Sequence, residues 1–144
     1  MPVSLPYSEF PVPASAPFPN GQKACRPLVL AQIKGSNGNQ FTCIACLDSG
    51  ADHCVFPLSF AVALGLDPLQ MKAQMTSGIG NIANMTYYDT IEIEIPNTPL
   101  SFSTLAGFTQ GLDALGMGLL GQFGFFDHYT VTFDHRARLF HIEK

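Results

Sequence analysis

The sequence predicts an all-β protein with one or two short helices. Apolar and polar residues alternate strictly over residues 90–95, which is typical of a strand with one buried face. Short apolar runs elsewhere are separated by turn residues, of which Gly35-Ser36-Asn37-Gly38-Asn39 is the clearest hairpin turn. Helical patterns are confined to residues 58–64 and 123–126, so strands are expected to build the core.

The N-terminal segment differs from the rest of the chain in composition. Six of the eleven prolines fall within the first nineteen positions, and no apolar period accompanies them. Such a segment is typical of an extended arm or linker. We therefore predict a Pro-rich N-terminal arm over residues 1–26 and one domain over residues 27–144.

The predicted elements of the domain follow one another with short turns. A hairpin comes first, and a turn, a short extended segment and a helix ended by Gly65 come next. Two long strands around a flexible tip, a further strand and a closing hairpin complete the chain. In chain order these elements occupy residues 27–33, 40–47, 53–56, 58–64, 70–75, 85–95, 100–105, 123–126 (a short helix), 129–133 and 138–142.

Composition limits the classes of function. Of the 144 residues, 12% are charged and 47% are hydrophobic, and the mean hydropathy is +0.19. So few charges suggest apolar surface that a partner or a substrate groove covers. The net charge of −4 and the lack of a Lys/Arg cluster argue against a nucleic-acid partner. No apolar run approaches the roughly 18 residues of a membrane span, and the first residues lack the features of a signal peptide, so a cytoplasmic location is expected.

Cys43 and Cys46 form a C-x-x-C pattern, which can bind zinc or carry redox chemistry. Both fall within a predicted strand, where residues three apart point to opposite faces. Such a pair cannot converge on one metal ion, and no second pair completes a site. Small buried thiols are the favoured interpretation, and no metal or cofactor is expected.

One aspartate stands at the end of an apolar strand. Asp48-Ser49-Gly50-Ala51 follows directly on the run that ends at Leu47, so Asp48 enters a tight turn. A second element of two apolar residues and a glycine, Leu119-Leu120-Gly121, lies much later in the chain. Asp-Ser-Gly alone is a weak signal, because an ordinary Asx turn has the same composition.

In their order along the chain, these elements resemble a retropepsin, the single-domain aspartic protease that works as a homodimer. The resemblance runs from about residue 27 to residue 143, and it includes the Asp-Ser-Gly loop, the Gly-Ile-Gly hairpin tip and the Leu-Leu-Gly element. The closing hairpin is closer in pattern to cellular and bacterial members than to viral ones. The resemblance implies a retropepsin-like acid-protease fold, which is a small closed β-barrel with a flap hairpin and one or two short helices.

The same resemblance implies roles for individual residues. Asp48 would be the catalytic carboxylate, with Ser49 and Gly50 supporting its loop. Substrate would contact the loop, the flap and the neighbouring strands through Leu47, Ala51, Asp52, Val55, Gly78, Ile79, Gly80 and Leu119. Plainer interpretations remain open. Asp48 or Asp52 could be only a turn residue, and Gly78-Ile79-Gly80 could be an ordinary hairpin tip. Leu119 is a core residue under either interpretation.

The chemistry of an aspartic protease requires two carboxylates that share one proton, because like charges about 3 Å apart cannot both ionise. The ionised carboxylate takes a proton from a water, and the protonated one donates a hydrogen bond to the scissile carbonyl. This chain has one Asp-Ser-Gly, so the second carboxylate has to come from a second copy. We therefore expect a homodimeric endopeptidase whose peptide or protein substrates carry apolar side chains near the scissile bond.

One position departs from the pattern of the family. Many members carry Arg after the apolar-apolar-Gly element, where it pairs with the acidic residue four positions after the catalytic Asp. This chain has Gln122 there, so Asp52 lacks its expected cation. The change affects the expected dimer contacts and the anchoring of substrate by Asp52, but not the catalytic pair itself.

Two aromatic–proline bonds lie within the predicted arm. Phe10-Pro11 and Phe18-Pro19 are of a bond type that retropepsins accept as a family. We therefore predict that the arm can enter a substrate groove and be trimmed there.

Two other function classes compete with the protease. The first is a catalytically silent module of the same fold that binds a peptide by strand addition or serves only for dimerisation. The intact Asp48-Ser49-Gly50 disfavours it, since such a module has no physical need for that carboxylate. The second is a redox or metal protein built on Cys43 and Cys46, which strand geometry disfavours.

Overall fold

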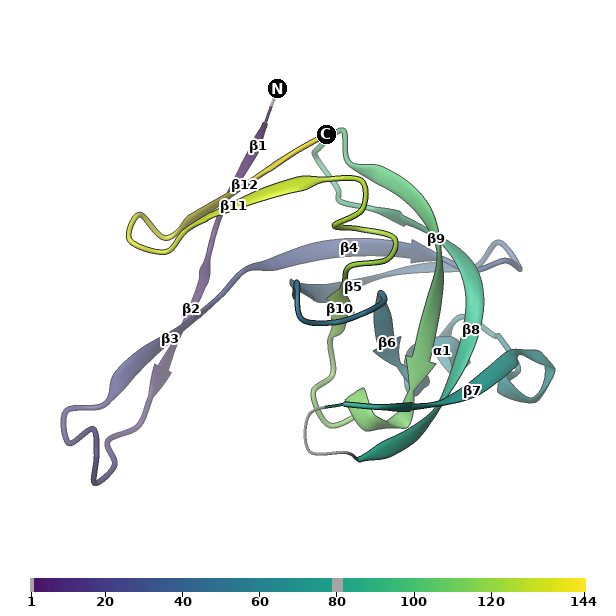
Figure 1. Cartoon of the computed structure of the whole chain (residues 1–144), viewed down its shortest axis with the longest axis horizontal. Coiled ribbons are helices and arrows are strands. Elements are labelled where there is room, and N and C mark those ends of the chain that lie inside the picture. The colour runs from purple at the N-terminus through teal and green to yellow at the C-terminus, as the bar shows by residue number, and fades with distance from the viewer. Residues whose placement is uncertain (1, 79–81) are drawn as a thin grey trace. The chain divides into compact units, whose positions relative to one another are not determined.

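Strands predominate in the computed structural model, which describes residues 2–78 and 82–144 (Figure 1). The predicted all-β class is confirmed. The chain divides into two compact units, of which the larger is Val29–His128 and the smaller combines Met1–Leu28 with Tyr129–Lys144. No helix within the described residues is long and apolar enough to cross a bilayer.

A seven-stranded sheet builds the larger unit. Its strands lie in the order β4 (Leu28–Lys34), β5 (Gln40–Leu47), β10 (Gly118–Leu120), β6 (Val55–Pro57), β9 (Ser101–Thr109), β8 (Ala83–Glu94) and β7 (Lys72–Ser77). β10 runs parallel to β5, and β6 runs parallel to β9, whereas β8 is antiparallel to both β7 and β9. β4 also pairs with β8, where Ile33 lies opposite Ile93.

The core of this unit follows from the alternation of the strands. Over residues 90–95 the isoleucines are buried and the intervening threonine and glutamates are exposed, as the sequence predicts. β4 shows the same alternation, because Ala31 and Ile33 are buried while Leu30 is 58% exposed. Fully buried phenylalanine rings, among them Phe56 and Phe108 with centroids 5.9 Å apart, fill the interior.

The helices are short and lie between strands. α1 (Leu58–Ala63) is confirmed, and Gly65 follows it with a φ of +76°, as expected for a glycine that ends a helix. Two 3-10 turns, η1 (Pro68–Gln70) and η2 (Gln110–Leu112), are additional. The predicted helix over residues 123–126 is wrong. Phe123 forms an isolated β-bridge with His53, and residues 124–126 form turns, in which Gly124 has a φ of +98° and packs so closely against Thr104 that a Cβ would collide with it.

The β7–β8 hairpin corresponds to the two long strands of the sequence prediction. Ile79 and Gly80, at its predicted tip, lie outside the described residues. β9 continues through Gly107 to Thr109, beyond the predicted end at residue 105. Within this extra length, Gly107 pairs with Tyr88 of β8.

The smaller unit contains the predicted closing hairpin, β11 (Thr130–Asp134) and β12 (Leu139–Glu143). β1 (Val3–Pro6) adds to β12 as a third strand, and β2 (Ser8–Val12) pairs with β3 (Gln22–Arg26) in a separate two-stranded sheet. The Pro-rich segment is therefore not a linker without secondary structure. Its prolines are tolerated because Pro6 ends a strand and Pro11 belongs to a two-stranded sheet, in which both strands are edges.

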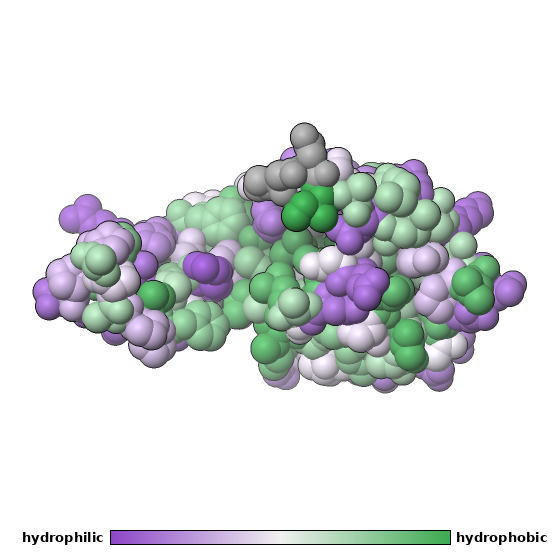
Figure 2. Space-filling model, turned by 90° about the horizontal axis from the view of Figure 1, so that it is seen from below, coloured by the Kyte–Doolittle hydropathy of each residue, from purple (hydrophilic) through white to green (hydrophobic). Residues whose placement is uncertain are grey.

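Apolar side chains are also present on the surface. On the face drawn in Figure 2, hydrophobic residues are interspersed with hydrophilic ones. Exposed large side chains come from both units and include Phe10, Phe18, Leu30, Ile44, Leu69, Ile82 and Phe123. This matches the low charge content, which leaves few polar side chains to cover the surface.

Candidate active site

Two strands of the larger unit place Asp48. β5 ends at Leu47, which is 4% exposed and lies opposite Leu120 of the parallel strand β10. The Asp48 N–H continues this ladder by donating to the Leu120 carbonyl oxygen at 3.0 Å. The apolar runs that the sequence shows before Asp48 and before Gly121 therefore pair, and their pairing fixes where the aspartate leaves the sheet.

The turn after β5 is closed by the aspartate itself. The Gly50 N–H donates to Asp48 Oδ1 at 2.9 Å, and the Ala51 N–H donates to the Asp48 carbonyl oxygen at 3.1 Å. This is an Asx turn, in which a side-chain oxygen replaces a backbone acceptor. A Cβ on Gly50 would meet only Asp48 Oδ1, at 3.2 Å, so the described residues of the same chain leave the other side of Gly50 open.

Close backbone packing explains why the Leu-Leu-Gly element ends in a glycine, Gly121. A Cβ at this position would collide with the carbonyl oxygens of His53 and Ala51, so the loop after Asp48 lies directly against the glycine backbone. The next two residues hold the loop there. The Gln122 N–H donates to the Ala51 carbonyl at 2.8 Å, and the Phe123 N–H donates to the Asp52 carbonyl at 2.9 Å.

Gln122 has a role that the sequence analysis missed. Its side-chain amide donates to the Ser49 carbonyl oxygen at 2.8 Å, so it ties the Asp48 turn to the segment after β10. Sequence reasoning treated this position only as the loss of an arginine. The role could have been suspected from the residue type, because glutamine, like arginine, carries an N–H donor at the end of its side chain.

The other predicted site residues divide into three groups. Ala51, Val55 and Leu119 are half-buried beside the Asp48 turn, and Val55 lies opposite Leu119 across the β6–β10 pair. Asp52 is exposed and forms no ion pair with any described residue. Gly78 is exposed at the end of β7, where its N–H donates to the Ile82 carbonyl at 3.4 Å.

The cysteines are placed as inert thiols. Cys43 is on the buried face of β5 and Cys46 is on the opposite face, as the strand geometry predicts. Burial raises the pKa of the Cys43 thiol to about 12 and the pKa of the Cys54 thiol to about 11, so both stay protonated at neutral pH. Since the thiolate is the nucleophile and the metal ligand, this argues against redox or metal chemistry at these two positions.

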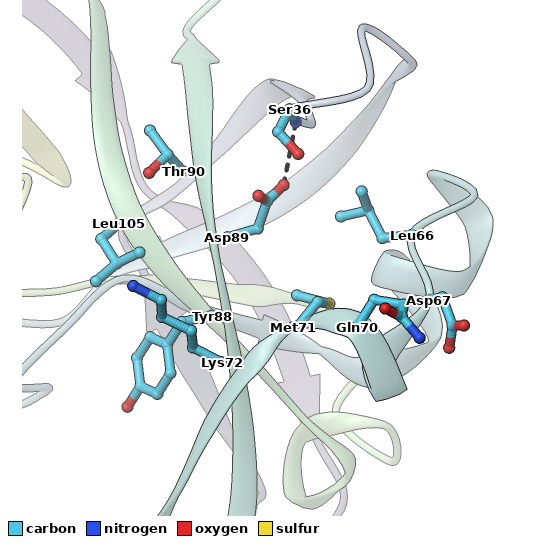
Figure 3. A pocket seen from close by; sticks show the side chains of 10 residues that line it. All are labelled: Ser36, Leu66, Asp67, Gln70, Met71, Lys72, Tyr88, Asp89, Thr90 and Leu105. Atoms are coloured by element: carbon cyan, nitrogen blue, oxygen red, sulfur yellow. Dashed lines mark hydrogen bonds between the residues drawn. The ribbon is translucent and has the colours of Figure 1, made fainter.

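The cavity in Figure 3 lies elsewhere in the larger unit. It has a volume of about 370 Å³ and is lined by residues of the turn after β4, of η1 and of the base of the β7–β8 hairpin, including Ser36, Asp67, Lys72 and Asp89. Asp89 accepts a hydrogen bond from the Ser36 N–H at 3.0 Å. None of the predicted site residues lines this cavity.

The comparisons with known proteins support the fold. Neither a protein-family model nor a curated protein sequence matches the chain. Among solved structures, the crystal structure of a retropepsin-like aspartic protease from Rickettsia conorii is similar, with a TM-score of 0.59 and 16% sequence identity. The match covers 93% of this chain and 98% of that one. The chain therefore has a retropepsin-like aspartic protease fold.

Proposed function

We propose that the protein is an aspartic endopeptidase whose active form is a homodimer. One observation carries the proposal. In a chain with a retropepsin-like fold, the single Asp-Ser-Gly turn leaves the sheet at the β5–β10 pair, and Asp48 both closes that turn and continues the ladder. The retropepsin-like fold and the position of this Asp-Ser-Gly turn at the end of β5, where the Asp48 N–H bonds β10, together support a catalytic role for Asp48.

The proposed catalytic pair consists of Asp48 from each of two copies. Two carboxylates at contact distance share one proton, so one acts as the base that activates a water and the other donates to the scissile carbonyl. The water attacks the carbonyl carbon, and the proton held by the pair passes to the leaving amine. No covalent intermediate with the protein is required.

A second copy is proposed because the sequence contains a single Asp-Ser-Gly, and neither Asp113 nor Asp127 is followed by Ser-Gly or Thr-Gly. Of the two aspartates nearest the Leu-Leu-Gly element, Asp113 accepts the Ser59 N–H at 3.1 Å and so serves the start of α1. Asp127 is exposed in a turn. The open side of Gly50 supports the proposal, because two such turns can approach each other without a clash of Cβ atoms.

The proposed substrate is an extended peptide with apolar side chains near the scissile bond. Val55 and Leu119 would contact those side chains, with Leu47 supporting them from the core and Ala51 and Asp52 bordering the main chain. The β7–β8 hairpin would act as a flap that covers the peptide through Gly78, Ile79 and Gly80. Peptide binding along strand edges supplies main-chain hydrogen bonds, and alternate side chains then determine specificity.

The test is cleavage of a diverse peptide library by the wild type and by Asp48→Asn. Asn is nearly isosteric with Asp, so this variant should fold and dimerise but lose cleavage. Asp127→Asn is the matched control, since it removes an exposed carboxylate outside the proposed pair, and it should cleave like the wild type. Undiminished cleavage by Asp48→Asn would end the proposal. Equal peptide binding by wild type and Asp48→Asn without any cleavage would favour the silent binding module instead.

A further inference from the structure

Three aromatic rings from three separate elements meet beside the Asp48 turn. His53 follows the turn, Phe123 follows the Leu-Leu-Gly element, and Tyr88 lies on β8. The His53 ring centroid is 5.9 Å from that of Phe123 and 6.1 Å from that of Tyr88, with interplanar angles of 64° and 76°. Both pairs are edge-to-face, which is a favoured arrangement of aromatic rings. His53 is therefore the central ring of the group.

Gly107 is the reason that Tyr88 can reach His53. β9 lies between β8 and β6, with Gly107 opposite Tyr88 on one side and opposite Val55 on the other. A Cβ on Gly107 would lie 2.6 Å from Thr86 Cγ2 and 3.3 Å from Tyr88 Cε1, so both side chains pack against the glycine. In Figure 3 the Tyr88 ring points away from Ser36 and Asp89. A larger residue at position 107 would collide with Thr86 and crowd the Tyr88 ring.

Tyr88 and Phe123, the two rings that contact His53, are each connected to a further element, the β7–β8 hairpin and the Asp48 turn respectively. The Tyr88 hydroxyl accepts a hydrogen bond from Gln74 Nε2 at 3.3 Å, which joins both strands of the β7–β8 hairpin to the group. On the other side, the Phe123 N–H donates to the Asp52 carbonyl, and the neighbouring Gln122 side chain donates to the Ser49 carbonyl. A continuous series of contacts therefore connects the hairpin with the Asp48 turn.

We propose that His53 is a positioning residue that couples the β7–β8 hairpin to the Asp48 turn through its ring contacts with Tyr88 and Phe123. Its catalytic consequence rests on the proposed protease function. The ring acts by its shape and packing, so an uncharged aromatic residue should replace it. His53 need not touch the substrate or the reacting atoms for this role.

The first test compares His53→Ala with His53→Phe. His53→Ala removes both ring contacts and should lower kcat/KM for a cleaved peptide about tenfold, mainly through a higher KM, because the hairpin no longer holds the peptide in place. His53→Phe keeps an aromatic ring and should restore kcat/KM and leave the pH profile unchanged. His128→Ala, at an exposed turn histidine, is the control and should behave as the wild type. Failure of His53→Phe to restore activity would overturn the proposal, because the imidazole nitrogens would then be essential.

The second test does not depend on proteolysis. Hydrogen–deuterium exchange should be faster in His53→Ala at residues 49–53 and also at residues 83–88, and it should be unchanged in His53→Phe and in β11–β12. Tyr88→Leu should give the same pattern, and its effect should add only in part to that of His53→Ala, since both variants lose the His53–Tyr88 contact. Faster exchange limited to residues 49–53 would show a purely local role and would overturn the coupling. If the wild type cleaves no peptide, the protease proposal fails, but the exchange pattern still tests the coupling between the hairpin and the turn.

Discussion

At the scale of single residues, Gln122 and Gly121 hold the Asp48 turn in place. Sequence reasoning found the glycine as part of a motif but gave it no contact of its own. It also treated Gln122 only as the absence of an arginine. The hydrogen-bond partner of the Gln122 side chain is a backbone carbonyl, which a sequence pattern cannot reveal. Asp48 itself could be found from the sequence, because an apolar strand that runs into Asp-Ser-Gly is visible without any tertiary contact.

The Gln122 side chain provides the first prediction at this scale. Gln122→Ala removes the hydrogen bond to the Ser49 carbonyl, which should be worth about 1 kcal/mol. We expect cleavage activity to fall about fivefold, because the turn that carries Asp48 is held less firmly. Steady-state kinetics beside Gln110→Ala, at an exposed position in η2, give the comparison. Equal loss in both variants would mean that the bond does not position the turn.

Gly121 gives a prediction about stability. Gly121→Ala would place a methyl group against the carbonyl oxygens of Ala51 and His53, so we expect a destabilisation of about 2 kcal/mol or more. Gly78→Ala is the matched control, because no heavy atom of the described residues lies within 4 Å of its added Cβ, and its free energy of unfolding should change little. Chemical denaturation of both variants measures the difference. Similar unfolding midpoints for the two would contradict the close approach at Gly121.

The buried thiols predict a pH dependence of stability. Unfolding exposes Cys43 and Cys54, whose pKa then returns from about 12 and about 11 to the ordinary value of 9.0. Between these values the folded state holds protons that the unfolded state has lost, so stability should decrease as the pH rises above 9.0. Denaturation between pH 8 and pH 10.5 should show a smaller decrease in the Cys43→Ala/Cys54→Ala variant. A wild-type slope in the Cys43→Ala/Cys54→Ala variant would refute the assignment.

At the scale of elements, the sequence predicted most strands and failed where tertiary contacts decide. Alternation located β8, and turn residues located the β4–β5 hairpin. The helix expected over residues 123–126 does not form, because Gly124 adopts a positive φ against Thr104, a residue distant in sequence. The Pro-rich segment forms strands because β12 and a hairpin of its own supply partners that its composition does not reveal.

These strands change the expectation for self-cleavage. Phe10-Pro11 lies in β2 and is paired with β3, so it cannot enter a groove without local unfolding. Phe18-Pro19 lies in the loop between these strands, where Phe18 is 49% exposed. We therefore expect trimming to produce a new N-terminus at Pro19 and not at Pro11. Intact-mass analysis of wild type and Asp48→Asn during prolonged incubation tests this, and identical ageing of the two proteins would exclude self-cleavage.

At the scale of the whole molecule, the chain carries one Asp-Ser-Gly turn where the proposed chemistry needs two. A two-fold axis brings the same residue of each copy to the same place, so a symmetric dimer supplies the second Asp48 without further sequence. Gly50 gives a specific test of this approach. Gly50→Ala should fold almost normally, because its Cβ would meet only Asp48 Oδ1 within the chain, but it should dimerise weakly and cleave poorly. Sedimentation and kinetics measure both effects, and a fully active Gly50→Ala dimer would argue against close contact of the two turns.

The dimer itself makes the strongest prediction, because the proposed mechanism cannot operate in one chain. Specific activity should fall on dilution through the dissociation constant of the dimer. Excess Asp48→Asn chains, mixed with wild type long enough for subunits to exchange, should suppress its activity, since each mixed dimer holds a single competent carboxylate. Excess Asp127→Asn chains should not suppress it, because their catalytic turns are intact. Sedimentation that shows a fully active monomer would instead require a second acid within the chain. Asp113 and Asp127, the aspartates on either side of the Leu-Leu-Gly element in the sequence, would then be the first to test, although Asp113 already serves the start of α1 and Asp127 lies exposed in a turn.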